Sequence, residues 1–180
     1  MHTDRFTPLD AATLLRWMQH DLPNKQLFGI GRELFFMPKP DDPFRMERYG
    51  KVLETPLGVA AGPHTQLAQN ILSAWLCGAR YIELKTVQVL DELNVAKPCI
   101  DMADEGYNCE WSQELKLDQS FEEYLKAFVL LYVLRDMLNL PVEADPGKGP
   151  GFIFNMSAGY NLEGIKSPAV QRFLDRMENA

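Results

Sequence analysis

The segment Leu57–Leu84, LGVAAGPHTQLAQNILSAWLCGARYIEL, decides the fold of this chain. It opens with a short apolar run that ends in Gly62-Pro63, which is typical of a strand buried on both faces. A helix follows, which we expect Thr65 to cap and Gly78 to end. Residues 80–84 then read as a second strand. Strand, helix and strand within about thirty residues predict a βαβ unit, a right-handed crossover between parallel strands.

Residues 1–54 precede this unit and form the first of two regions that we expect. A helix should open at Thr7-Pro8, with Thr7 as its cap, and extend to about His20. Prolines and glycines in residues 22–43 predict an extended wrap, and residues 44–54 predict a short hairpin around Tyr49-Gly50.

Residues 55–180 form the second region and continue the α/β pattern. A capping box at Ser120-Phe121-Glu122-Glu123 predicts a helix to about Leu138, and a third strand is expected at residues 152–154. A last helix should begin at Ser167-Pro168, whereas residues 87–119 predict a long loop at the active face, with room for small strands. Three strands cannot close an eight-stranded barrel, which needs about 250 residues. We therefore expect these 180 residues to be a piece of a longer chain.

Composition excludes several classes of protein. A hydrophobic content of 46% argues against disorder, and a net charge of -7 argues against broad nucleic-acid binding, although a local basic pocket remains possible. The chain has no apolar run of membrane-spanning length and no signal-peptide core at its N-terminus, so we expect a cytoplasmic protein. Cys77, Cys99 and Cys109 have no metal-ligand spacing, which predicts free thiols and no metal site.

Two of the candidate site segments follow the first two strands. Ligands of parallel α/β folds bind at the carboxyl ends of the strands, where residues 60–65 begin a turn of small residues that brings the backbone close to a flat or anionic ligand. An ordinary tight turn explains the same residues. Alternation places Glu83 and Lys85 on one face of the second strand, so they either form a salt bridge or leave Lys85 to neutralise the electron-rich N1–C2 edge of a flavin.

The third candidate segment, residues 155–161, follows the third strand. Asn155 offers both a donor and an acceptor to a heterocyclic ring, while Asn161 either faces a substrate or stabilises a turn. His64 is a candidate acid or base, but it is equally read as a hydrogen-bonded loop residue. The acidic residues Asp101, Asp104 and Glu105 are better explained as a solvated loop than as a carboxylate site.

These segments resemble two known families. Residues 55–62, TPLGVAAG, resemble the N-P-x-G-x-A-x-G opening of the dihydroorotate and dihydropyrimidine dehydrogenases, FMN enzymes with a (β/α)8 TIM barrel. Residues 60–71, 82–88, 97–112 and 152–166 together resemble the N-terminal region of the selenate reductase iron-sulfur subunits. The resemblance implies a partial TIM barrel, its first three βα units preceded by the N-terminal helix, wrap and hairpin, in a longer protein that also carries iron-sulfur clusters and an FAD and NAD(P)H module.

The resemblance also implies which residues bind a cofactor. Ala60, Ala61 and Gly62 match the backbone that lies against the isoalloxazine ring of FMN, and Lys85 and Thr86 match a Lys-Thr pair that contacts it. Asn108 and Asn155 match two further cofactor-binding asparagines, and His64 and Asn161 are left as substrate-side candidates.

The chain also departs from the dehydrogenase pattern. His64-Thr65-Gln66 stand where dihydroorotate dehydrogenases carry a lysine. The loop that bears their catalytic base lies beyond Ala180, so the catalytic residue is unknown and we do not expect this segment to complete a reaction alone.

Two functions remain open at this point. The first is a flavin-type oxidoreductase segment that transfers electrons between NAD(P)H, clusters and a small-molecule substrate. The second is an inactive barrel that serves as a scaffold or docking domain for downstream redox modules and a molybdenum-containing partner subunit. The lysine that is missing near His64 favours the second, and the residues that match the FMN contacts favour the first.

Overall fold

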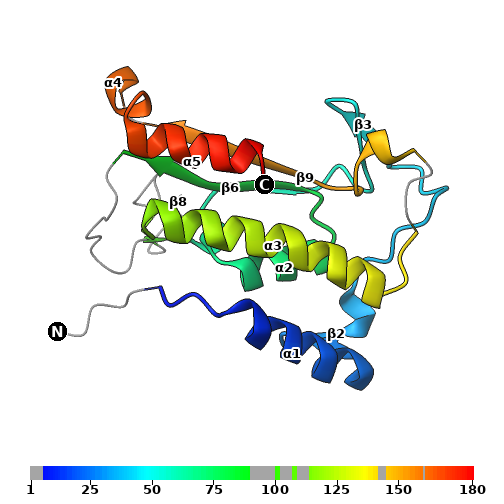
Figure 1. Ribbon diagram of the computed structural model, residues 1–180. Helices are drawn as coiled ribbons and strands as arrows, with labels where there is room; N and C mark the ends of the chain where they lie inside the picture. The colour runs from blue at the N-terminus through cyan, green and yellow to red at the C-terminus, as the bar shows by residue number, and fades with distance from the viewer. Residues whose placement is uncertain (1–5, 90–99, 102–106, 109–113, 142–144, 160) are drawn as a thin grey trace.

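A three-stranded parallel sheet lies at the centre of the computed structural model (Figure 1). The structure describes residues 6–89, 100–101, 107–108, 114–141, 145–159 and 161–180, with 100–101 and 107–108 described by their backbone alone. The strand order is β5 (Gly58–Val59), β6 (Tyr81–Gln88) and β9 (Ile153–Gly159), and β5 is joined to β6 through α2 (Ala68–Leu76). The predicted βαβ unit is confirmed.

Helices cover one face of this sheet. Leu84 of β6 is buried together with residues of α2, α3 (Leu117–Met137), α5 (Pro168–Glu178) and α1 (Ala11–Asp21). Figure 1 shows α3 between α5 and α1, and the rings of Phe121 and Phe173 join α3 to α5 edge to face at 6.5 Å. Because α3 has neighbours on several sides, its apolar residues are not confined to one stripe.

A hairpin lies at the amino ends of the strands, at the right of Figure 1, whereas α4 (Leu162–Ile165) lies at their carboxyl ends. The strands of the hairpin are β3 (Met46–Arg48) and β4 (Lys51–Leu53), which confirms the hairpin predicted for residues 44–54. Lys51 Nζ donates to the Gly147 carbonyl at 2.9 Å, and Lys148 pairs with Glu47 at 2.6 Å. These contacts fix the hairpin to η4 (Pro146–Lys148), the turn that leads into β9.

Short elements fill the two segments without a clear period. The expected wrap contains η1 (Leu22–Asn24), the pair β1 (Gln26–Leu27) and β2 (Ile30–Gly31), and η2 (Arg32–Leu34). The long loop contains the antiparallel pair β7 (Ile100–Asp101) and β8 (Tyr107–Asn108), so small strands are present there as expected.

Two predicted helix starts are wrong. The first helix begins at Ala11 and not at Pro8, because Asp10 is the N-cap and accepts from the Thr13 amide at 2.7 Å. The helix expected at Ser120 begins at Leu117, where Gln119 Oε1 accepts from the Lys116 amide at 3.0 Å. Ser120 is therefore a buried residue of the first helical turn. The helix starts three residues before the predicted capping box, at the cap formed by Lys116 and Gln119.

Charged side chains form a buried cluster at the amino end of β6. The Glu54 carboxylate accepts from Arg80 Nε at 2.5 Å and from Arg135 Nη1 at 2.8 Å. Arg80 is 0% exposed, and its guanidinium lies over the ring of Trp75 at 4.2 Å. Burial lowers the pKa of Arg80 to about 10, while Glu54 acts in the opposite direction, so the arginine stays charged at neutral pH.

Candidate functional site

The turn after β5 is closed by its own residues. Gly62 N donates to Thr65 Oγ1 at 3.1 Å, and Thr65 N donates to the Gly62 carbonyl at 3.0 Å, which forms η3 (Pro63–Gln66). Thr65 therefore does not cap α2 as predicted, because α2 begins three residues later, after Leu67. The Gly62 amide, which we expected to be open to a ligand, is already bonded within the turn.

The Glu83 carboxylate accepts a hydrogen bond from the amide of Ala61, the residue before Gly62. Ala61 N donates to Glu83 Oε2 at 3.2 Å, which links the end of β5 to the middle of β6. The salt bridge between Glu83 and Lys85, one of the two alternatives, is absent from the ion pairs of the described residues. A flat ring above residues 60–62 would therefore meet their small side chains and bonded amides, a surface suited to stacking.

Lys85 and Thr86 lie in a β-bulge. Leu84 pairs with Met156 of β9 and Val87 pairs with Ala158, so two residues of β6 lie opposite the single residue Ser157. The bulge reverses the alternation along β6, because Leu84 and Val87 both pack into the helix-covered core although three positions separate them. Lys85 is 1% exposed. It lies inside β6, which extends to Gln88 and is longer than the strand predicted over residues 80–84.

Tyr124 anchors this bulge from the helix layer. Its hydroxyl, on α3, donates to the Lys85 carbonyl at 2.8 Å. The phenol is 0% exposed, and burial raises its pKa, so Tyr124 stays protonated and able to donate. Sequence analysis predicted a helix over this residue but no role for its hydroxyl. No local signal reveals its partner, which lies 39 residues away in the chain.

His64 lies on the rim of the same site. Its ring covers Gly62 so closely that a Cβ at that position would come within 2.6 Å of His64 Cε1. Partial burial lowers the pKa of His64, a hydrogen bond with the Ala60 backbone raises it, and the positive charge of Lys85 lowers it again. The charge of Lys85, on β6, therefore acts on the protonation of His64, in the turn after β5.

The asparagine candidates differ in their surroundings. Asn155 on β9 is half-buried and lies in register with Glu83, so it is a neighbour of the linked strands β5 and β6. Asn161 Oδ1 accepts from the Gly164 amide at 2.8 Å and caps α4, which is the stabilising role weighed as its alternative. The backbone of Asn108 belongs to β8, and its side chain lies outside the described residues.

Gln66 and Glu123 are two further residues that sequence analysis missed. Gln66 Oε1 accepts from the amides of Glu114 and Leu115 at 2.6 and 3.2 Å, which binds the approach to α3 to the η3 turn. Glu123, on α3 and 1% exposed, accepts from Ala68 N at 2.8 Å and so caps α2 from another helix. Both fix the loop that carries His64.

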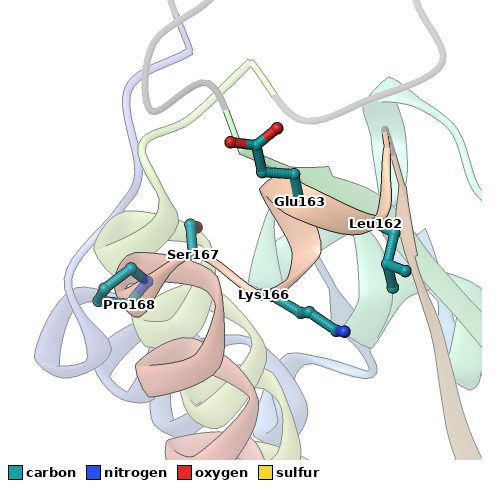
Figure 2. Close-up of a pocket in the computed structure, with 5 residues that line it drawn as sticks. All are labelled: Leu162, Glu163, Lys166, Ser167 and Pro168. Carbon is teal, nitrogen blue, oxygen red and sulfur yellow. The ribbon is translucent and has the colours of Figure 1, made fainter.

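An open hollow of about 790 Å³ borders the site (Figure 2). It is lined by five residues of α4 and the start of α5: Leu162, Glu163, Lys166, Ser167 and Pro168. Figure 2 shows Glu163 and Lys166 leaving α4 in different directions. A Cβ at Gly164 would come within 2.3 Å of Val89 Cγ1, so the short helix packs closely on the end of β6.

Metal and membrane sites were also sought in the described part of the chain. It contains no group of three or more His, Cys, Asp or Glu residues placed to hold a metal ion. None of its helices is both long and apolar enough to cross a bilayer. Cys77 is an exposed free thiol, whereas Cys99, Cys109, Asp104 and Glu105 lie outside the described residues and Asp101 is described by its backbone only.

Parallel strands with crossover helices and polar groups towards their carboxyl ends are features that β/α-barrel domains share with other parallel α/β folds. A family model described as the N-terminal TIM-barrel domain of the oxidoreductase YgfK matches residues 28–180, and the chain belongs to this family.

Two curated relatives carry the same name. The proteins named "Putative oxidoreductase YgfK" of Escherichia coli strain K12 and Escherichia coli O157:H7 are each 51% identical to the chain over 156 residues. The match covers 87% of this chain but only 14% of each relative, so the chain spans about one seventh of their length. No solved structure matches the chain.

Proposed function

We propose that this domain binds the isoalloxazine ring of FMN at the carboxyl ends of β5, β6 and β9, as the first part of a barrel like that of the dihydroorotate dehydrogenases. It would serve a multidomain oxidoreductase in which iron-sulfur clusters, FAD and NAD(P)H belong to other segments. The observation that supports this most is the position of Lys85, a buried lysine in the bulge of β6, because a lysine beside the isoalloxazine ring would favour the reduced, negatively charged form of the flavin.

The residues present fit the ring of FMN. FMN supplies hydride and electron transfer when it is bound. Ala60, Ala61 and Gly62 offer a surface without large side chains, and Asn155 offers a donor and an acceptor one strand further along the sheet. Lys85 supplies a positive charge. Thr86, beside it in the bulge, completes the cofactor contacts that we propose for the described residues, and Asn108 is proposed from sequence alone.

The protein's own residues have distinct tasks in this proposal. Glu83 holds the Ala61 amide and so fixes the surface on which the ring rests. His64, on the rim, contacts the small-molecule substrate and accepts or donates a proton at its imidazole. Asn161 caps α4 and shapes the loop after β9, so its contribution to the substrate side is indirect.

FMN binding tests this proposal directly. The protein to use is E. coli YgfK in which this chain replaces the matched segment, because the chain spans only 14% of that relative. FMN is titrated and followed by flavin absorbance and fluorescence. Lys85→Met should weaken binding at least about tenfold, because a hydrogen bond to a charged group contributes about 1.5–3 kcal/mol.

Lys148→Met, at the opposite end of the sheet, is the matched control and should leave FMN affinity unchanged. A protein that remains colourless in excess FMN refutes the proposal. So does equal FMN affinity of the Lys85 and Lys148 variants.

A scaffold function is the second candidate. The observation that favours it is that the turn amides of Ala61 and Gly62 are bonded to Glu83 and Thr65. Under this alternative the domain docks the redox modules and a molybdenum-containing subunit. The chimaera, E. coli YgfK in which this chain replaces the matched segment, would then bind no flavin. It would still retain those partners in a pull-down, even when Asn155 and Lys85 are substituted.

A further inference from the structure

The proposed function uses the side chains of the bulge but not the hydrogen bond that holds its backbone. The bulge takes Lys85 and Thr86 out of the regular pairing between β6 and β9, since the register passes from Leu84 directly to Val87. The Lys85 carbonyl then accepts the hydroxyl of Tyr124 at 2.8 Å, inside the helix-covered core. A buried backbone carbonyl needs a hydrogen-bond partner, and Tyr124 provides one across the interface between α3 and β6.

This contact determines more than the local backbone. The direction of a side chain from a bulge follows from the backbone angles of the bulged residue, because the alternation of a regular strand no longer sets it. The Lys85 carbonyl and the Lys85 side chain share one Cα. A hydrogen bond that fixes the carbonyl therefore also fixes the direction in which the buried Lys85 side chain leaves the strand.

We propose that Tyr124 is a positioning residue, whose hydroxyl holds the bulge and so fixes the place of the buried Lys85 side chain in the site. The inference rests on the proposed function only where FMN is concerned. The placement of the Lys85 side chain is measurable without any ligand.

The protonation of His64 gives the ligand-free measurement. The chain contains only three histidines, so the ring signals are few and each is assigned by its own His→Gln variant. Lys85 lowers the pKa of His64, and the Ala60 backbone and partial burial also act on it. An NMR titration of His64 in the 180-residue chain therefore reports where the Lys85 charge lies.

Four variants decide the question. Lys85→Met should raise the pKa of His64, because a like charge is removed. Tyr124→Phe keeps the ring and its packing, and should raise the pKa of His64 in the same direction by a smaller amount. The double variant should equal Lys85→Met alone, because both changes act through one ammonium group. Tyr132→Phe, at a half-exposed tyrosine of the same helix, should change nothing.

Rescue distinguishes positioning from general support of the fold. 4-Aminophenylalanine at position 124 retains an N–H donor and should restore the wild-type pKa of His64. This variant also serves if Tyr124→Phe does not fold. The proposal is overturned if Tyr124→Phe leaves the pKa of His64 unchanged, if Lys85→Met does so, or if the double variant shifts it further than Lys85→Met.

FMN affinity supplies the second measurement, in the E. coli chimaera. Tyr124→Phe should weaken FMN binding severalfold, by less than Lys85→Met, and Tyr132→Phe should not. If the wild-type chimaera binds no FMN, the proposed function fails while the His64 titration still decides the role of Tyr124. If FMN binds and Tyr124→Phe changes neither affinity nor the pKa of His64, the positioning role fails while the proposed function stands.

Discussion

The two ends of the parallel sheet hold their charges in opposite ways. At the amino end, Glu54 is bonded to both Arg80 and Arg135, so the buried charges of opposite sign face one another. At the carboxyl end, Lys85 and His64 bring two basic groups together, and the Glu83 carboxylate bonds the Ala61 amide instead of Lys85. The first arrangement joins charges of opposite sign, whereas in the second the positive charge of Lys85 lowers the pKa of His64.

This difference indicates that stability and chemistry depend on opposite ends of the sheet. In β/α barrels the amino ends of the strands stabilise the fold and the carboxyl ends carry the chemistry. The chain follows that division at the level of individual bonds, because its closed ion cluster and its basic site lie at opposite ends of β6. Substitutions at the amino end should therefore change stability, and those at the carboxyl end should change the site.

The largest expected effect is at Glu54. Glu54→Ala leaves two buried guanidinium groups without their carboxylate, which should lower the free energy of unfolding by about 3–5 kcal/mol. Urea unfolding followed by circular dichroism measures it. Glu47→Ala breaks the exposed pair with Lys148 and should cost less than about 1 kcal/mol. Equal losses in the two variants would contradict the division between the ends.

Glu123 and Glu122 form the next test, on adjacent positions of α3. Glu123→Ala removes the cap of the Ala68 amide and the ion pair with Lys126, and should lower the free energy of unfolding by about 1–3 kcal/mol. Glu122→Ala breaks only an exposed pair with Arg176 and should cost less than about 1 kcal/mol. The cap model is wrong if the exposed neighbour proves equally important in the same unfolding assay.

Two glycines sharpen the comparison further. Gly78, before β6, has φ +105°, so Gly78→Ala should lower the free energy of unfolding by about 1–2 kcal/mol. Gly62 has extended backbone with φ −167°, and its added Cβ meets only the movable His64 ring. Gly62→Ala should change stability by less than about 0.5 kcal/mol but raise the pKa of His64, as its ring leaves the neighbourhood of Lys85. A large loss of stability in Gly62→Ala would show that this turn is structural.

The smallest expected effect is the pH dependence due to His64. Its pKa is below the ordinary value of 6.5 in the folded state, so the unfolded chain binds the proton more readily. This contribution destabilises the fold as the pH falls below about 6.5 and vanishes above it. His64→Gln should flatten the stability curve in that window. The curve is measured by unfolding at a series of pH values, and an unchanged slope in His64→Gln would rule out this linkage.

The local sequence pattern predicted which strands and helices form more accurately than the residues at which they begin and end. The apolar run before Gly62 and the apolar residues at 80–84 led correctly to parallel strands. The expected burial of the first strand on both faces is wrong, because β5 lies at the edge of the described sheet, with Gly58 exposed and Val59 half-buried. The cap at Thr7 was placed wrongly because Asp10 offers a second, equally good capping side chain. Thr65 was misread for a similar reason: it closes the preceding turn through Gly62, and no cap residue marks the start of α2.

The candidate site was predicted in part. Residues 60–62 and His64 do follow β5, since that edge follows from topology alone. Lys85 and Asn155 were expected after their strands but lie inside β6 and β9, because both strands extend beyond the predicted residues 80–84 and 152–154. The bulge at Lys85 was not foreseen, because alternation in the sequence assumes a regular strand. The bonds of Glu83 to Ala61 and of Tyr124 to Lys85 join residues 22 and 39 positions apart, beyond any local pattern.

The sequence by itself determined the α/β class of this chain, its βαβ unit and the edge at which a ligand would bind, because apolar periodicity and turn chemistry act over a few residues. Tertiary structure alone decided which charges are satisfied. Glu54 meets Arg135 across 81 residues and Lys85 is turned by a bulge that Tyr124 secures, because a buried polar group takes its partner from whichever element packs against it.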